Sequence, residues 1–177
     1  LKRTELAELP TMIRLGRGET AKLKLGELRA LGAGFPLRGT FRIADGRGEH
    51  VVANGPAKGT LWLSRAGADA LGAKLGDTIA LGTSEFRLAA LVLQEPDGSI
   101  DYFNVAPRVF AAMDDLAGTG LVQPGSRIEY KLVVAGDAAA VERFTRTARA
   151  TLARGQKLET IADARPEIRS ALERAGR

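Results

Sequence analysis

The residue types that a hydrolytic or metal-binding site needs are scarce in this chain. His50 is the only histidine, which excludes a two-histidine zinc motif, and its Gly- and charge-rich surroundings favour a solvated loop residue. No serine stands in a Gly-x-Ser-x-Gly elbow, and a single histidine leaves no usual triad to activate one. The absence of cysteine excludes thiolate metal sites and cysteine nucleophiles. The sequence therefore predicts no catalytic, cofactor-binding or metal-binding residue and favours a protein that is not an enzyme.

Two short glycine motifs have some likeness to loops that bind phosphate. They are Gly-Arg-Gly at residues 16–18 and Leu-Gly-Ala-Gly at residues 31–34. Neither continues into Gly-Lys-Ser/Thr, and neither forms the G-x-G-x-x-G fingerprint between a strand and a helix. We interpret both motifs as turns, and the sequence predicts no nucleotide cofactor.

The adjacent carboxylates Asp114 and Asp115 form a further candidate at a predicted helix end. Neighbouring side chains on a helix point about 100° apart, which is a poor geometry for sharing a proton or a metal ion. A solvated helix end is the interpretation that the sequence favours.

A row of arginines could bind phosphates: Arg143, Arg146 and Arg149. Glu142 lies on the same side of the predicted helix, and the row is also the face left over when the apolar stripe is buried. The formal net charge is +5, and 19 of the 26 basic residues are arginines. This balance permits contact with nucleic acid or anionic lipid without requiring either, and we expect no nucleic-acid partner.

The composition indicates a folded protein. With 177 residues, of which 45% are hydrophobic and 27% charged, the chain can bury the core of one domain or of two small lobes. No segment approaches the length of about 18 consecutive apolar residues that a membrane-spanning helix needs. The sequence predicts neither a membrane span nor a secretion signal within it.

The stretch 59–93 predicts a strand, a short helix and a hairpin. An apolar run at 61–63 is followed by Ser64, which can cap a helix N-terminus. Two alternating runs at 79–81 and 86–92 are joined by a short connection, as in a β-hairpin. Such β-rich modules are common in barrel-like domains.

The N-terminal part predicts an amphipathic arm at 1–9, stopped by Pro10, and then a hairpin made by 11–15 and 21–25. The second strand has an alternating pattern that predicts one wet face. The alternating residues are Leu23 and Leu25 on one side and Lys22 and Lys24 on the other. A further strand is expected at 37–43.

Residues 44–58 are rich in Gly, Asp and Pro and predict a loop in which an inserted lobe begins. Tyr102 and Phe103 are adjacent aromatic residues beside the loop at 94–99. Because neighbouring strand residues point to opposite sides, we expect at least one of them to be exposed at a loop or rim. After Pro107, apolar spacing predicts a helix. The residues of its stripe are Val109, Phe110, Met113 and Leu116.

The last third predicts a βαβ unit with a right-handed crossover. An alternating strand at 128–134 precedes Asp137, a helix cap. The stripe of the following helix is Val141, Phe144, Ala148 and Leu152. Gly155 is expected to end that helix, a strand is expected at 157–161, and a final helix is expected to begin at Pro166.

Four segments together resemble a known family. They are GFPLRGTFRIADG (34–46), GTLWLSRAGADALGAKLGDTIALGTSEFRLAALV (59–92), YFNVAPRVFAAMDDLAGTGLVQPGSRIEYKLVVAGD (102–137) and DARPEIRSALERA (163–175). Their order and spacing resemble the extracytoplasmic domain of an FtsX-like, MacB-type ABC transporter permease. Within that family the chain is most similar to the large permeases with two periplasmic domains that are associated with lysophospholipase biosynthesis.

The resemblance implies an α+β fold of the MacB-type periplasmic core domain. A porter-like lobe that contains the βαβ unit is expected from both chain ends, residues 1–45 plus 120–177. A β-rich lobe, residues 46–119, is expected to be inserted into it. The resemblance also implies a location outside the cytoplasm, in the periplasm, between the first two membrane helices of a permease embedded in the inner membrane.

The resemblance further implies a non-catalytic part of a transporter. A separate cytoplasmic ATPase subunit would supply the energy, and a dimeric permease would pass the motion to a periplasmic partner protein or to a hydrophobic, lipid-like cargo. The two chain ends, 1–9 and 166–177, would be the stalk ends where motion enters. Tyr102 and Phe103 are the candidate contact surface.

Two other classes of function stay open from the residues alone. A free-standing binding module for nucleic acid or an acidic partner is suggested by the +5 charge and the arginine-rich helix. A small hydrolase with an unfamiliar site is the third class, which the missing histidine cluster disfavours.

Overall fold

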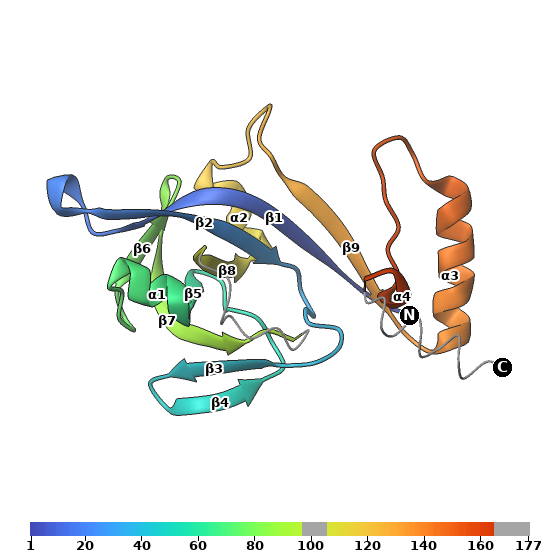
Figure 1. The fold of residues 1–177 in the computed structure, drawn as a ribbon, viewed down its shortest axis with the longest axis horizontal. Coiled ribbons are helices and arrows are strands. Elements are labelled where there is room, and N and C mark those ends of the chain that lie inside the picture. Colours follow the sequence, from blue (N-terminus) through green and yellow to red (C-terminus); the bar gives the residue numbers. More distant parts are fainter. Residues whose placement is uncertain (97–105, 165–177) are drawn as a thin grey trace. The chain divides into compact units, whose positions relative to one another are not determined.

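The computed structural model describes residues 1–96 and 106–164 (Figure 1). The chain forms two compact units: residues Lys2–Ala135, and Leu1 together with the residues from Gly136 onward. The first unit contains a nine-stranded sheet, and the second contains helices. The mixed α and β content predicted from the sequence is confirmed. The finer division into a lobe of residues 1–45 plus 120–177 and an inserted lobe of residues 46–119 stays a prediction.

The predicted N-terminal hairpin is confirmed, and it is longer than the sequence indicated. It consists of β1 (Lys2–Leu15) and β2 (Lys22–Leu31), joined through the short turn η1 (Gly18–Thr20). Gly16 has a φ of +83°, a value that residues with a side chain rarely adopt. The Gly-Arg-Gly motif is therefore a turn, as predicted.

The predicted arm at residues 1–9 is wrong, because these residues belong to β1. Their outer edge forms a ladder with β9 (Glu129–Ala135). Pro10 does not interrupt β1 because it lies between the part that pairs with β9 and the part that pairs with β6 (Thr78–Leu81). Within the described residues, no strand pairs with this edge of β1 at Pro10. The N–H that proline lacks is therefore not missed by a ladder hydrogen bond there, and such positions tolerate proline.

Residues 44–58, predicted to be a loop, contain a strand. β3 (Phe41–Asp45) and β4 (Gly48–Val52) form an antiparallel hairpin. The Arg47 N–H donates a hydrogen bond to Asp45 Oδ1 at 2.8 Å, and this local turn reverses the chain. The side chains of β4 are exposed or half-buried, so the strand lacks the alternation of buried and exposed residues by which a sequence reveals it.

The module predicted at 59–93 is confirmed. It consists of β5 (Thr60–Ser64), α1 (Arg65–Leu71), β6 and β7 (Ser84–Gln94). The Ser64 Oγ accepts a hydrogen bond from the Gly67 N–H at 3.1 Å, which is the predicted helix cap.

The helix predicted after Pro107 is mostly wrong. Residues Arg108–Ala112 form strand β8, and only Met113–Leu116 (α2) and Ala117–Thr119 (η2) are helical. β8 pairs with β2 on one edge and with β5 on the other. Its central residues are therefore buried in succession, and a short continuous apolar run cannot be distinguished from a buried helix by its periodicity. These residues are Val109, Phe110 and Ala111.

The strand order is β4-β3-β7-β5-β8-β2-β1-β6, with β9 beside β1, and β6 also pairs with β7. The pairings thus return to their start and close a ring of strands, β7-β5-β8-β2-β1-β6. The pairs β2–β8 and β5–β7 are parallel, whereas the other pairs are antiparallel. Closing a sheet on itself removes free strand edges within the ring and encloses a core.

The core has two apolar clusters within the first unit. The larger one packs residues from β1, β2, β5, β6, β7 and β8 beneath α1. The second is built around Phe41, whose ring centroid lies 5.3 Å from that of Trp62 and 5.7 Å from that of Phe110 in edge-to-face arrangements. Trp62 is therefore a core residue.

The second unit contains α3 (Ala138–Thr151) and α4 (Ile161–Ala164). The predicted cap is confirmed, because Asp137 Oδ1 accepts a hydrogen bond from the Ala140 N–H at 2.8 Å. Strand β9, before α3, is also as predicted, but α3 ends at Thr151 rather than near Gly155.

The strand predicted at 157–161 is wrong, so the described residues contain no βαβ unit there. The reason is local: Thr160 begins α4 instead of ending a strand. Asp163 Oδ2 accepts a hydrogen bond from the Thr160 N–H at 2.9 Å, and the Asp163 N–H donates to Thr160 Oγ1 at 3.3 Å, which is a reciprocal capping arrangement. The final helix predicted from Pro166 lies outside the described residues.

Candidate interaction surface

The turn end of the β1–β2 hairpin presents large apolar side chains to solvent. Met12 lies opposite Leu25 across the ladder, and Leu23 lies opposite Arg14, so the three apolar side chains share one face. Met12 is 47% exposed, Leu23 53% and Leu25 63%. Pro10 is exposed on the same face, two residues before Met12. We call this surface the hairpin face; its residues are Pro10, Met12, Leu23 and Leu25.

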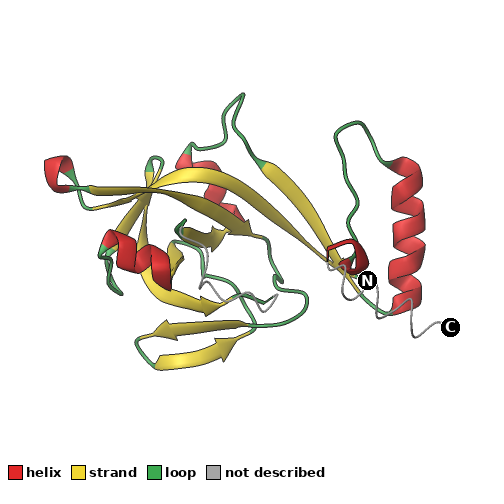
Figure 2. Cartoon of the chain, viewed as in Figure 1, coloured by secondary structure: helices red, strands yellow, loops and turns green. Residues whose placement is uncertain are grey.

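The sequence predicted one wet face for this hairpin, whereas near the turn Leu23 and Leu25 are exposed as well as Lys22 and Lys24, although Ile13, opposite Lys24, is buried. β8 pairs with β2 only from Glu27 onward, so among the described residues the turn end has no strand neighbour on that edge. Figure 2 shows the turn end of the hairpin projecting past the other strands of its unit. In the described part of the chain, Leu23 and Leu25 each keep more than half of their surface open to solvent. Contiguous exposed apolar residues rimmed by polar ones are typical of interaction sites.

An open groove of about 680 Å³ adjoins the hairpin face. Pro10 and Leu25 belong to both surfaces. The groove is lined by residues of β1 and β2 and by the segment that leads into β9. Three carboxylates and one guanidinium give it a polar wall; they are Glu8, Glu27, Glu129 and Arg127.

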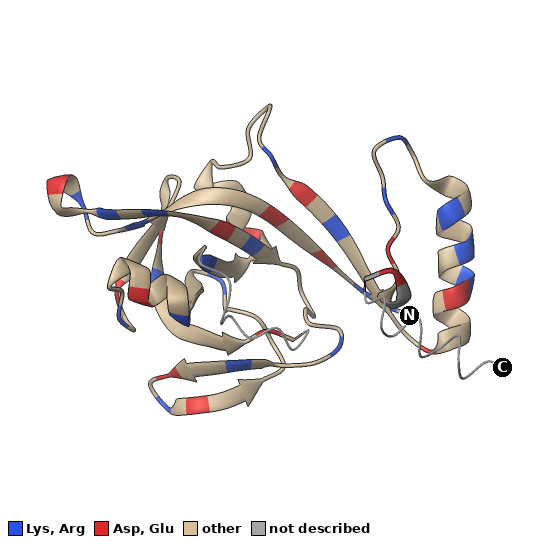
Figure 3. Ribbon diagram, viewed as in Figure 1, with Lys and Arg blue, Asp and Glu red and all other residues tan. Residues whose placement is uncertain are grey.

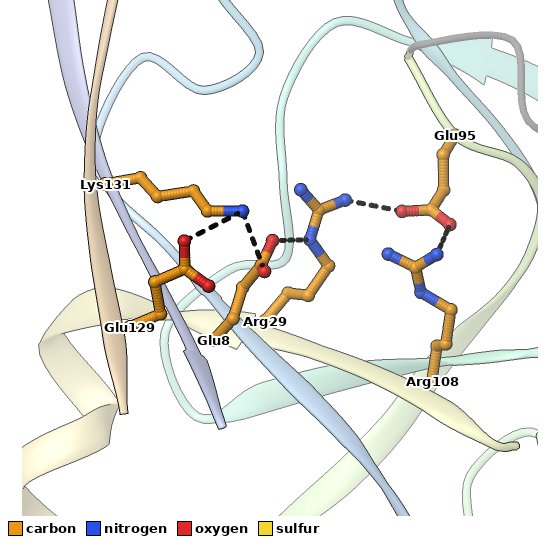
Figure 4. A network of polar contacts seen from close by, with 6 residues as sticks. All are labelled: Glu8, Arg29, Glu95, Arg108, Glu129 and Lys131. Atoms are coloured by element: carbon orange, nitrogen blue, oxygen red, sulfur yellow. Dashed lines mark hydrogen bonds and ion pairs between the residues drawn. The ribbon is translucent and has the colours of Figure 1, made fainter. Parts of the chain in front are cut away.

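A network of ion pairs supports one wall of this groove (Figure 4). Arg29 of β2 is its centre: its Nε lies 3.1 Å from Glu8 Oε1 of β1, and its Nη1 lies 2.6 Å from Glu95 Oε1, just after β7. Arg108 of β8 contacts the other Glu95 oxygen, Oε2, at 3.0 Å. These side chains are between 7% and 18% exposed. Removing one partner would leave a poorly solvated charge unpaired.

The same network extends to β9. Lys131 Nζ lies 3.0 Å from Glu8 Oε2 and 3.7 Å from Glu129 Oε1. Glu8 and Glu129 also line the groove. The network as a whole has three carboxylates and three cations, so its formal charges balance; the residues are Glu8, Glu95, Glu129, Arg29, Arg108 and Lys131. The network therefore holds the groove wall in place across β1, β2, β8, β9 and the end of β7.

The contact residues predicted from the sequence, Tyr102 and Phe103, lie outside the described residues. The hairpin face and the ion network escaped the sequence analysis. Leu23 and Leu25 alternate with lysines, which is the pattern of a strand with one buried face. The sequence pattern does not indicate that β8 pairs with β2 only from Glu27 onward. The ion pairs join residues up to 123 positions apart, and no local motif marks such pairs.

The other polar candidates have structural roles. Asp115 Oδ2 accepts a hydrogen bond from the Gly59 N–H at 2.8 Å. His50 lies in β4, and its Nε2 is 3.6 Å from Asp45 Oδ2. The backbone N–H of Arg47, and more weakly the nearby charges of His50 and Arg47, hold the pKa of the Asp45 carboxyl below its usual range, although desolvation acts in the opposite direction.

Neither a metal site nor a membrane span is evident in the described part of the chain. Across residues 1–96 and 106–164, no three His, Cys, Asp or Glu side chains gather in a group that could hold a metal ion. In the same ranges, no helix is both long enough and apolar enough to cross a bilayer.

Comparison with known proteins gives one relative in sequence. No protein-family model matches the chain. Over 82 residues the chain is 38% identical to the uncharacterized ABC transporter permease YbbP of Escherichia coli (strain K12). The matched stretch covers 46% of this chain and 10% of that permease.

Among the solved structures with a similar fold are the extracytoplasmic parts of two transporters. The periplasmic region of MacB from Actinobacillus actinomycetemcomitans matches with a TM-score of 0.51 and 13% identity, over 85% of this chain and 66% of that one. The extracellular domain of the noncanonic ABC-type transporter YknZ from Gram-positive bacteria matches with a TM-score of 0.51 and 13% identity, over 82% of this chain and 72% of that one.

These likenesses agree with the expected location, because both solved neighbours are parts of transporters that lie outside the cytoplasm. The resemblance seen in the sequence is thereby confirmed at two levels: this chain is similar in sequence to an ABC transporter permease and has the fold of MacB-type extracytoplasmic domains.

Proposed function

We propose that this chain is a non-catalytic extracytoplasmic domain of an ABC transporter permease and that it contacts a periplasmic partner protein through the hairpin face. The observation that carries the contact is the exposure of Met12, Leu23 and Leu25 on one side of a projecting hairpin. Burying such side chains against a partner is favourable by about 25 cal/mol for each Å² of apolar surface removed from water.

The ion network supports this role because its ion pairs hold together the strands that carry the hairpin face. Arg29 and Glu8 tie the two strands of the hairpin together at the end away from the turn. The adjoining groove offers a concave region for a side chain or a segment of the partner.

The rest of the transport cycle is proposed from the family. A cytoplasmic ATPase subunit hydrolyses ATP, and two permease copies transmit the resulting motion to this domain. The domain then moves its partner, or a hydrophobic, lipid-like cargo that the partner accepts. The division into a porter-like lobe and an inserted β-rich lobe belongs to the same proposal.

Site-specific photo-crosslinking in the full transporter tests the contact. A photoreactive residue at Leu25 should give adducts with a periplasmic protein, whereas the same residue at Lys24, on the opposite face of β2, should give few. Leu23→Ser/Leu25→Ser should lower transport, and Lys22→Ser/Lys24→Ser is the matched control. Equal adducts from both faces, or normal transport by the leucine variant, would remove the hairpin face from the proposal.

A further inference from the structure

Helix α3 carries several cationic residues along its length (Figure 3). Arg143, Arg146 and Arg149 are spaced by three residues, so they follow one another along the helix surface. All three are exposed. Arg154, shortly after the helix, is exposed as well. The transport role proposed above makes no use of this face.

Within the described residues, few carboxylates pair with these arginines. Arg146 pairs with Glu142 at 3.3 Å, but both side chains are about three-quarters exposed (74% and 75%), and such surface pairs are weak. In residues 1–96 and 106–164, Arg143, Arg149 and Arg154 form no ion pair with a carboxylate. This contrasts with Arg29 and Arg108, which are held in a balanced network of the first unit.

The polarity of α3 is divided between two sides. Val141, Phe144 and Ala148 are half-buried on the apolar side, so the arginines lie on the side directed to solvent. Leu152, just after α3, is 42% exposed. It lines one small hollow of the second unit together with Arg149 and Lys157, and with the carboxylates of Glu159 and Asp163.

We propose that this arginine face binds the anionic phosphate headgroups of a lipid bilayer. Cationic side chains beside exposed aliphatic ones are the combination that a membrane interface accommodates, since headgroups take the charge and the acyl boundary takes the apolar groups. A nucleic-acid backbone also attracts arginines, but it gains nothing from the exposed aliphatic side chain of Leu152 beside Arg149. The inference rests on the proposed function to the extent that a permease domain works beside a bilayer.

Vesicle flotation of the 177-residue chain tests the proposal. The vesicles contain phosphatidylcholine with phosphatidylglycerol, and vesicles of phosphatidylcholine alone are the reference. Arg143→Gln/Arg149→Gln removes two charges from the face. Lys58→Gln/Arg87→Gln removes two exposed charges from the first unit and is the matched control. Circular dichroism confirms that each variant is folded.

We expect binding only to the anionic vesicles, weakened by salt, and a roughly 30-fold loss of affinity in the α3 variant with little loss in the control. Equal losses in the two variants, or no binding to anionic vesicles, would overturn the proposal. So would tighter, equally arginine-dependent binding to a DNA duplex at the same ionic strength. Failure here would leave the hairpin crosslinks unchanged, so it is distinguishable from failure of the proposed function.

Discussion

Arg29 of β2 and Glu95, just after β7, form a largely buried ion pair, with Arg29 Nη1 2.6 Å from Glu95 Oε1, although they are 66 positions apart in the sequence. Glu95 also contacts Arg108, so this one carboxylate holds two guanidinium groups. We expect Glu95→Gln to lower the free energy of unfolding by about 3 kcal/mol, because it leaves two poorly solvated cations with less compensation. Urea unfolding followed by circular dichroism measures this change.

Glu49→Gln is the matched control for that prediction. Glu49 is 50% exposed and pairs with the exposed Arg42, so its substitution should cost less than about 1 kcal/mol. A Glu95 variant as stable as the Glu49 variant would show that the network adds no stability beyond that of a surface pair.

Gly82 is expected to resist substitution more than any exposed turn glycine. Its φ is +56°, and a Cβ there would lie 2.0 Å from the Thr119 backbone oxygen. Gly82→Ala should therefore destabilise the fold by at least about 2 kcal/mol. Gly46→Ala is the control, because a Cβ at Gly46 meets nothing within 4 Å. Thermal unfolding of both variants decides the matter, and equal midpoints would contradict the prediction.

The Asp45 turn should make a pH-dependent contribution to stability. The folded-state pKa of Asp45 is lowered, chiefly by the hydrogen bond from the Arg47 N–H. The contribution is therefore complete above the pKa that Asp45 has in the unfolded chain, and it is lost as the pH falls through the lower folded-state pKa. NMR titration of the Asp45 carboxyl should give a midpoint below the usual range for aspartate. Asp45→Asn should flatten this part of the stability profile, and an unchanged profile would refute the assignment.

Tyr102 and Phe103 stay a predicted contact surface. If they touch a partner or a cargo, Tyr102→Ser/Phe103→Ser in the full transporter should reduce transport without lowering the amount of protein in the membrane. The double variant Val51→Ser/Leu75→Ser, at exposed apolar residues elsewhere, is the control. Normal transport and partner binding by the first variant would remove this pair from the account.

Local chemistry explains which elements could be predicted from the sequence. Ser64 and Asp137 are helix caps, and a cap works through a hydrogen bond to a residue three positions away. The hairpin at 79–92 was likewise predictable, because its two strands alternate and its connection is short. In such cases the sequence neighbours are also the neighbours in space.

The missed elements depend on residues that are distant in the sequence. β8 was expected to be a helix because strands on both of its edges bury every central side chain, and that removes its alternation. β4 escaped notice because it has little contact with the core. Leu25 lies beyond the part of β2 that pairs with β8, which its own sequence surroundings do not indicate. Glu95 contacts Arg29 only in the folded ring of strands, because the two residues are far apart in the sequence. Resemblance to a family supplied the fold where periodicity alone did not.

The ladder between β1 and β9 brings the two exits of the first unit together. Lys2 lies opposite Ala135, so the chain enters and leaves at the same end of this antiparallel pair, and Glu8 opposite Glu129 is the other end. A force that draws these two exits apart would unzip the ladder one residue pair at a time instead of shearing all its hydrogen bonds at once. The Lys131–Glu8 ion pair lies toward the end of the ladder where Glu8 is opposite Glu129. Under such a force, the residue pairs near Lys2 and Ala135 are expected to separate before those near Glu8 and Glu129.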